Sequence, residues 1–214
     1  MSEALSTGAS PAPGGSSELI SLGKNVIDAE IAGLRAVRDR LDERFAKVVQ
    51  LVLECRGKVV FTGIGKSGHI GRKLAATFAS TGTPAFFVHA DEALHGDSGM
   101  VEPKDLVFAI SNSGETAELL GFVSIIRKIG APIVAMTARA GSTLAKQAVV
   151  TLDISVPAEA DPHDLVPSAS AAATLAIGDA VAIVVMQKRG FGKEQFAVFH
   201  PGGALGARLL GSGS

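Results

Sequence analysis

The sequence predicts an α/β fold in which helices cover both faces of a doubly wound, five-stranded parallel sheet. Short apolar runs recur five times, at residues 58–62, 84–89, 105–110, 131–137 and 149–155. Segments of helical composition separate most of these runs, and strands that alternate with helices form right-handed crossovers within one parallel sheet. The apolar residues are mainly Ala, Val, Ile and Leu, with 5% aromatic, which suits helices packed closely on a buried sheet.

The expected helices lie before, between and after the strands. From residue 18 to 55, apolar residues recur at helical spacing, which predicts one long amphipathic helix or two shorter ones ending before Gly57. Further helices are expected at 68–82, 115–129, 141–148 and 168–188, with a short one near 204–210. Five parallel strands joined in this way give a flavodoxin-like architecture.

The chain of 214 residues is long enough for one α/β domain. Residues 1–17 are rich in Ser, Gly, Pro and Ala and are expected to form a disordered leader. The domain itself is expected at 18–210, followed by a short tail at 211–214. The chain begins without a basic and then apolar segment, so no signal peptide is predicted. No run of about 18 consecutive apolar residues predicts a membrane span.

Composition excludes several classes of partner. The net charge is −1 and the chain has no Trp or Tyr, so neither nucleic acids nor anionic membranes are expected to bind. The single cysteine, Cys55, cannot form an internal disulfide or a Cys-rich zinc site, which favours a reducing, cytoplasmic location. The mean hydropathy of +0.34 favours burial of some surface in an oligomer.

A glycine-rich loop follows the first predicted strand and begins the next helix. Residues 63–68, GIGKSG, satisfy the pattern G-x-G-x-x-G. The glycines let the backbone approach an anion, the helix N-terminus supplies N–H donors, and Lys66 and Ser67 add a cation and a hydroxyl. The same pattern occurs in dinucleotide-binding folds, with Asp91 and Glu92 near the place of a ribose-binding acid, so a nicotinamide-dependent oxidoreductase is an alternative. A plain tight turn is the simplest alternative.

A second polar loop follows the third predicted strand. Residues 111–116, SNSGET, also open a helix, where hydroxyl and backbone N–H groups can bind a phosphate. A helix N-cap would explain one such residue, but this loop supplies several. Because a dinucleotide fold needs no second hydroxyl-rich loop, this segment favours a phosphate ester as ligand.

Three segments together resemble the arabinose-5-phosphate isomerases of the sugar isomerase (SIS) family. They are GIGKSGHIGRKLAATFASTGTPAFFVHADEALHGDSGMV from residue 63, AISNSGETAEL from residue 109 and FAVFHPGGALGARLL from residue 196. The resemblance extends from about residue 20 to 210. SNSGET alone marks only the superfamily, which includes sugar-binding regulators, whereas GKSGHIGRK, HGD and HPGGALG are more specific.

The resemblance implies an aldose–ketose isomerase that interconverts ribulose 5-phosphate and arabinose 5-phosphate for synthesis of Kdo, a sugar of Gram-negative lipopolysaccharide. Such enzymes need no cofactor and are typically homotetramers with active sites shared between subunits. Many of them carry a tandem CBS pair after the isomerase domain, whereas this sequence ends at Ser214.

The resemblance also assigns the site residues. The catalytic residues it implies are Lys66, Glu118, Glu159, His95 and His200. The substrate-binding residues it implies are Gly65, Ser67, Gly82, Thr83, Ser111, Asn112, Ser113 and Thr116. His89 matches a histidine at which zinc binds in relatives without being needed for turnover, so zinc here is expected to be adventitious or inhibitory.

In the expected mechanism, Glu118 or Glu159 removes the C–H proton, His200 or His95 opens the sugar ring, and Lys66 stabilises an enediolate. A solvated helix residue is the structural alternative for Glu118. Where relatives have a hydroxyl-rich start to the last long helix, this chain has alanines at 171 and 172, which bears on sugar specificity. A non-catalytic sugar-phosphate sensor and an isomerase for another sugar phosphate are the alternatives.

Overall fold

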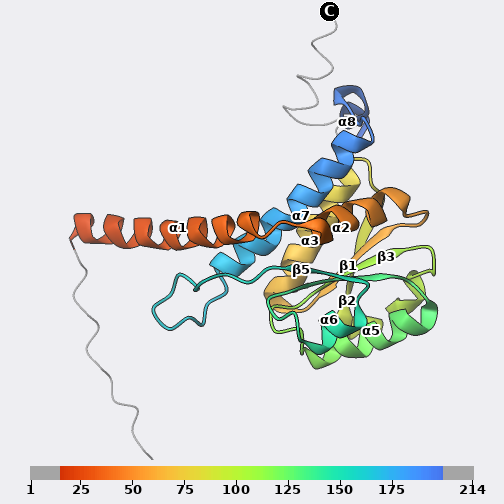
Figure 1. Ribbon diagram of the computed structural model, residues 1–214, viewed down its shortest axis with the longest axis horizontal. Coiled ribbons are helices and arrows are strands. Elements are labelled where there is room, and N and C mark those ends of the chain that lie inside the picture. Colours follow the sequence, from red (N-terminus) through yellow and green to blue (C-terminus); the bar gives the residue numbers. More distant parts are fainter. Residues whose placement is uncertain (1–14, 200–214) are drawn as a thin grey trace, which may run out of the picture.

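Five parallel strands form one sheet in the computed structural model, which describes residues 15–199 (Figure 1). The strands are β1 (Val59–Gly63), β2 (Ala85–His89), β3 (Leu106–Ile110), β4 (Ile133–Thr137) and β5 (Val150–Asp153). Their spatial order is β2-β1-β3-β4-β5, and every adjacent pair is parallel. This is the flavodoxin-like order, so the predicted fold class is confirmed.

Helices cover both faces of this sheet. One face carries α2 (Glu43–Glu54), α3 (Gly65–Ser80) and α7 (Ala169–Lys188). The other carries α4 (Ala90–Ala93), α5 (Ala117–Ile129) and α6 (Thr143–Gln147). Because both faces are covered, β1, β3 and β4 are buried along their whole length, as expected of a parallel sheet.

Aromatic side chains fill the core beneath α3. The Phe61 and Phe108 rings, from adjacent strands, stack with their centroids 5.0 Å apart. Phe78 of α3 meets Phe61 edge to face at 5.1 Å. All three side chains are fully buried, so they fix α3 firmly over the middle of the sheet.

The N-terminal helical region consists of two helices, α1 (Ser16–Asp39) and α2. They are separate because Asp42 caps α2, its carboxylate accepting a hydrogen bond from the backbone N–H of Arg44 at 2.9 Å. The later part of α1 packs against α7, where Gly33 and Val37 are buried. The first part extends away from the sheet (Figure 1).

Three short helices were not predicted from the sequence. They are α4, the 3₁₀ helix η1 (Asp97–Met100) and α8 (Lys193–Phe199). All are too short to show an apolar period, which explains why the pattern missed them. The expected helix near 204–210, the tail at 211–214 and nearly all of the leader lie outside the described residues.

Helix α7 is the one helix within residues 15–199 whose length and apolar composition would suffice to cross a membrane. It packs against α1, α2 and α3, and half of its most apolar stretch is buried inside the protein. A core position therefore accounts for its composition.

Candidate active site

The two polar loops lie side by side at the carboxyl end of the sheet. The first loop follows β1 and the second follows β3, and these strands are hydrogen-bonded neighbours, with Gly63 opposite Ile110. Between them the strand order reverses, since β2 continues from β1 in one direction and β4 from β3 in the other. Ligands of open α/β sheets bind at such a switch point.

A cavity of about 250 Å³ lies at this switch point. Lys66 and Ser67 line it from the first loop and Asn112 from the second. Ser170 and Thr174 line it from α7. The remaining lining is apolar: Ile64, Ile70, Ile154, Pro167 and Ala171. The two loops identified in the sequence therefore share one cavity.

Glycines hold the first loop close to the strands. Gly65, the first residue of α3, has φ of +57°, a conformation that favours glycine. A Cβ at Gly68 would lie 2.9 Å from the Gly63 carbonyl oxygen, so only glycine lets α3 approach β1 this closely. The N-terminal N–H groups of α3 are thereby held next to Lys66 and Ser67, an arrangement that favours an anion.

The second loop is shaped by its own hydroxyls. Ser111 is buried, its Oγ lies 2.9 Å from Thr116 Oγ1, and it accepts a hydrogen bond from the Gly114 N–H at 3.1 Å. The Asn112 carbonyl accepts from Thr137 Oγ1 at 3.1 Å, which ties the loop to β4. Ser111 and Thr116 therefore hold the loop in shape, and Asn112 is the residue of this loop that lines the cavity.

Glu159 lies in the loop after β5, at the N-terminus of α7. Its carboxylate accepts hydrogen bonds from the backbone N–H groups of Ser168 at 2.9 Å and Ser170 at 3.1 Å, and from both serine hydroxyls. Burial alone would raise the pKa of Glu159, but these hydrogen bonds, led by that from the Ser170 hydroxyl, outweigh it and hold the pKa below its ordinary value. Because Ser170 also lines the cavity, Glu159 lies directly behind the cavity wall.

The other predicted acid–base residues are not brought to this cavity within one chain. Glu118 is exposed in the first turn of α5, and His95 is exposed between α4 and η1. Neither side chain lines the cavity. His200 lies outside the described residues. The catalytic roles of these three residues stay predictions.

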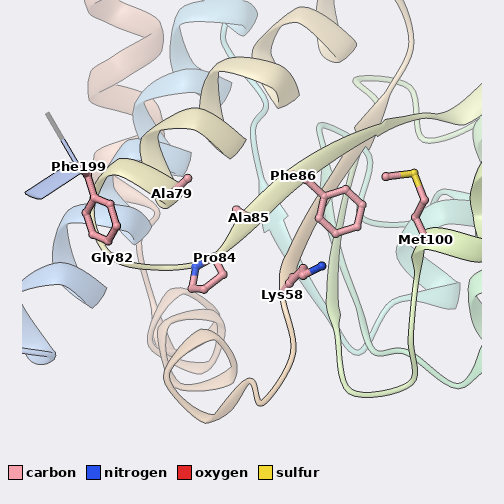
Figure 2. A pocket seen from close by; sticks show the side chains of 8 residues that line it. All are labelled: Lys58, Ala79, Gly82, Pro84, Ala85, Phe86, Met100 and Phe199. Atoms are coloured by element: carbon pink, nitrogen blue, oxygen red, sulfur yellow. The ribbon is translucent and has the colours of Figure 1, made fainter. Parts of the chain in front are cut away.

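Gly82 and Thr83 precede β2. They lie at the amino end of the parallel strands, opposite the carboxyl end where the two loops lie. Thr83 is buried and accepts a hydrogen bond from Arg189 Nη1 at 2.8 Å. Gly82 lines a different cavity, of about 710 Å³, together with Lys58 and Phe86 (Figure 2). Neither Gly82 nor Thr83 lines the cavity at the switch point. Their contact with the sugar stays a prediction.

His89 is the last residue of β2, and its Nδ1 is buried with no hydrogen-bond partner in the described part of the chain. Among residues 15–199, no group of three His, Cys, Asp or Glu side chains is close enough to hold a metal ion. A lone imidazole is a weak zinc site. Zinc at His89 stays a prediction.

Thr174 is the cavity residue that sequence reasoning missed. It stands one helical turn after Ser170, so the two hydroxyl residues share a face of α7. The available signal was two hydroxyl residues four positions apart in the apolar first half of this helix. Thr174 Oγ1 donates to the Ser170 carbonyl at 2.7 Å, which fixes its orientation in the cavity wall.

The SIS domain family model matches residues 52–184. The arabinose 5-phosphate isomerases KdsD of Salmonella typhi and Pseudomonas aeruginosa are each 49% identical, over 188 and 191 residues. These matches cover 88% and 89% of this chain but 57% and 56% of the relatives, so the chain spans little more than half of their length.

Among solved structures, Escherichia coli CFT073 c3406 in complex with arabinose 5-phosphate has a TM-score of 0.86 and 44% sequence identity. The match covers 88% of this chain and 100% of that one. The family model spans more than half of the chain, and c3406 matches over its full length. This chain therefore belongs to the SIS domain family.

Proposed function

We propose that this protein is an aldose–ketose isomerase that interconverts ribulose 5-phosphate and arabinose 5-phosphate. The observation that carries the proposal is the single cavity in which Lys66, Ser67 and Asn112 meet at the switch point of the sheet. The KdsD relatives and the complex of c3406 with arabinose 5-phosphate support this choice of sugar phosphate.

The phosphate is expected to bind where the two loops converge. The N-terminus of α3 offers backbone N–H groups and a positive dipole end, and Ser67 adds a hydroxyl. The cavity of about 250 Å³ is smaller than the roughly 300–1,000 Å³ of pockets for drug-sized ligands. It suits a small sugar phosphate better than a dinucleotide, which argues against the oxidoreductase alternative.

The isomerisation requires a base and a stabilised oxyanion. In the direction from ketose to aldose, the base removes a proton from C1 and negative charge develops on the carbonyl oxygen of C2. The proton returns to C2, and a proton moves from O1 to O2, which gives the aldose with no net change in oxidation state. Lys66, in the cavity, can stabilise the enediolate oxygen. Glu159, which hydrogen-bonds the cavity residue Ser170, is the proposed base for the C–H proton. Glu118 is the alternative base.

We also propose that several copies assemble, as a homotetramer with shared sites. Glu118, His95 and His200 can then contribute to the cavity of a neighbouring copy. The first part of α1 supports assembly, because it extends from the body (Figure 1). It also carries exposed apolar side chains. They are Leu19, Ile20, Leu22, Val26, Ile27, Ile31 and Leu34. The charged residues of α1 are of both signs, unlike the basic face of a helix that binds membrane surfaces.

The reaction needs neither a redox cofactor nor a metal, and zinc at His89 would be adventitious or inhibitory. The aldose product would enter the synthesis of Kdo, as the name KdsD of the relatives suggests. We place this activity in the cytoplasm, in keeping with the single cysteine.

A direct assay of the purified chain tests the proposal. Ribulose 5-phosphate is incubated with the protein beside ribose, glucose and fructose phosphates, and the products are identified by NMR. We expect arabinose 5-phosphate from ribulose 5-phosphate and little turnover of the hexose phosphates. Tight binding of a sugar phosphate without turnover would instead identify a sensor, and tight NAD binding that ribulose 5-phosphate does not displace would favour an oxidoreductase.

A further inference from the structure

The end of α1 contacts both ends of the loop that carries Glu159, residues 154–168. At Gly33, where α1 crosses α7, a Cβ would lie 3.1 Å from Val156 Cγ1 and 3.3 Å from Ala169 Cβ. Val156 follows the start of the loop and Ala169 follows its end. One point on α1 therefore packs against the chain entering and leaving this loop.

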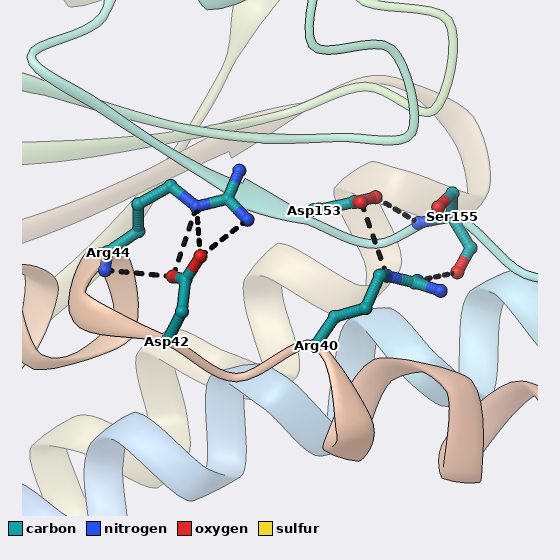
Figure 3. Close-up of polar contacts among 5 residues, drawn as sticks. All are labelled: Arg40, Asp42, Arg44, Asp153 and Ser155. Atoms are coloured by element: carbon teal, nitrogen blue, oxygen red, sulfur yellow. Dashed lines mark hydrogen bonds and ion pairs between the residues drawn. The ribbon is translucent and has the colours of Figure 1, made fainter.

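Arg40, the C-cap residue directly after α1, contacts the start of the same loop (Figure 3). Its Nη2 donates a hydrogen bond to the Ser155 carbonyl oxygen. Its Nε lies 3.2 Å from Asp153 Oδ2, and Asp153 Oδ1 accepts from the Ser155 N–H at 2.9 Å. The contact of Arg40 with Asp153 is an ion pair, since Arg40 Nε has no hydrogen-bond partner in the described part of the chain. The ion pair and the two hydrogen bonds link Arg40, Asp153 and Ser155 where the chain leaves β5.

Glu159 lies only a few residues after Ser155 in the sequence. Ile154, between Asp153 and Ser155, is buried and lines the cavity. Beyond Glu159, residues 162–166 are exposed and are held largely by the Asp161 carboxylate within the loop itself. The Glu159 N–H also donates a hydrogen bond to Asp164 Oδ1 at 2.7 Å. The placement of Glu159 therefore depends on this contact within the loop as well as on the two ends of the loop, at α1 and at the N-terminus of α7.

We propose that Arg40 is a positioning residue for Glu159, holding the start of the 154–168 loop so that the Glu159 carboxylate stays at the N-terminus of α7 beside the cavity. The catalytic consequence rests on the proposed function, whereas the effect on the loop does not. A guanidinium suits this task because its rigid fork can reach a carbonyl and a carboxylate at once, which a lysine ammonium does less well.

The kinetic test compares Arg40→Ala with Arg44→Ala. Arg44 is the control, since it lies at the same junction but its hydrogen bonds and ion pair go to Asp42 (Figure 3), and its attraction to Asp153 is the smallest of its electrostatic interactions. A small displacement of a reacting group can cost up to about 100-fold in rate. We expect R40A to lower kcat by about 10- to 100-fold with KM close to wild type, and R44A to leave both unchanged.

A double-mutant cycle separates positioning from general destabilisation. If Arg40 acts through Glu159, R40A lowers kcat in the wild-type background and has no further effect when Glu159 is already replaced by Gln. If Arg40 merely stabilises the fold, the loss of activity appears equally in both backgrounds, and the proposal is wrong. Asp153→Asn, which weakens the same set of contacts more gently, replaces R40A should that variant fail to fold.

Amide hydrogen exchange provides a readout that is independent of activity. Peptides that cover residues 156–168 should exchange faster in R40A than in wild type, and at the wild-type rate in R44A. Unchanged exchange in R40A would overturn the proposal. If the wild type does not isomerise ribulose 5-phosphate but R40A speeds exchange in this loop, the proposed function fails and the positioning role stands.

Discussion

Lys66 and Glu159 illustrate how the site combines positive charge with an ionised acid. Lys66 stands in the first turn of α3 and lines the cavity, where the helix dipole also favours negative charge. Glu159 is a carboxylate at the N-terminus of α7, surrounded by donors. The two helix N-termini thus differ: residues of the first turn of α3 line the cavity, whereas the N-terminus of α7 is occupied by the Glu159 carboxylate.

Replacing Lys66 should impair the chemical step. Lys66→Met removes the cation that would stabilise the enediolate, and we expect kcat to fall by roughly 10²–10³-fold, as when a single oxyanion donor is lost. Lys188→Ala, at the exposed end of α7, is the control and should keep full activity. Steady-state kinetics with ribulose 5-phosphate measure both variants. Normal kcat in K66M would remove Lys66 from the mechanism.

The lowered pKa of Glu159 also predicts a pH-dependent contribution to stability. Because its pKa in the folded protein lies below the ordinary value of 4.5, the ionised form stabilises the fold at neutral pH. This contribution is lost as the pH falls through the folded-state pKa. Glu159→Gln should therefore cost roughly 0.5–1 kcal/mol of unfolding free energy at pH 7 and much less near pH 3.

Urea denaturation of wild type and E159Q at both pH values measures this difference. Glu115→Gln is a comparison variant, since hydrogen bonding to Thr143 likewise lowers the pKa of Glu115, but away from α7. A cost for E159Q that does not change between the two pH values would mean that the charge of Glu159 contributes nothing to the fold.

At the scale of elements, the turn between β3 and α5 depends on one glycine. Gly114 has φ of +67°, and a Cβ there would lie 2.2 Å from Ser142 Oγ and 2.9 Å from Thr137 Oγ1. A side chain would therefore push the second loop away from β4 and α6. Gly130, which ends α5, has φ of +92°, but a Cβ added there would meet no atom within 4 Å.

These two glycines form a matched pair for mutation. Gly130→Ala should cost only the backbone strain of about 1–2 kcal/mol and keep sugar-phosphate binding. Gly114→Ala should cost more, because the steric clash adds to the same strain, and should weaken binding of ribulose 5-phosphate. Thermal denaturation and calorimetric titration check both effects. Equal stability and equal binding in the two variants would show that the second loop does not need to pack closely against β4 and α6.

The sequence predicted the elements that have a strong period and missed those held by local contacts. All five strands and the long helices were found because buried apolar runs and helical spacing extend over enough residues. The break between α1 and α2 comes from the Asp42 cap, and η1 from a turn at Gly96 with φ of 128°. Such features depend on one or two residues, which periodicity does not detect.

Part of the site was also predictable, since glycine and hydroxyl residues after adjacent strands must meet at one edge of a parallel sheet. The sequence could not predict that Glu159 accepts hydrogen bonds from α7, because this depends on how a loop of over ten residues folds back. It also could not show that Ser111 and Thr116 would pair with each other.

At the scale of the whole molecule, the protruding half of α1 predicts self-association. Ile27 is 58% exposed and is one of the exposed apolar side chains of α1. Ile27→Glu should shift the protein toward smaller species by placing a charge in the buried interface. Asn25→Glu, at an exposed polar position of the same helix, should leave the mass unchanged. Light scattering at several concentrations compares them, and a monomeric wild type would contradict the proposed assembly.

Isomerisation of ribulose 5-phosphate in D₂O tests the central claim most directly. Transfer of a proton through an enediolate lets the abstracted proton exchange with solvent, so NMR should show arabinose 5-phosphate carrying deuterium at C2, formed only with the protein present. A cavity that binds the sugar phosphate yet yields no aldose above the protein-free control would contradict the account.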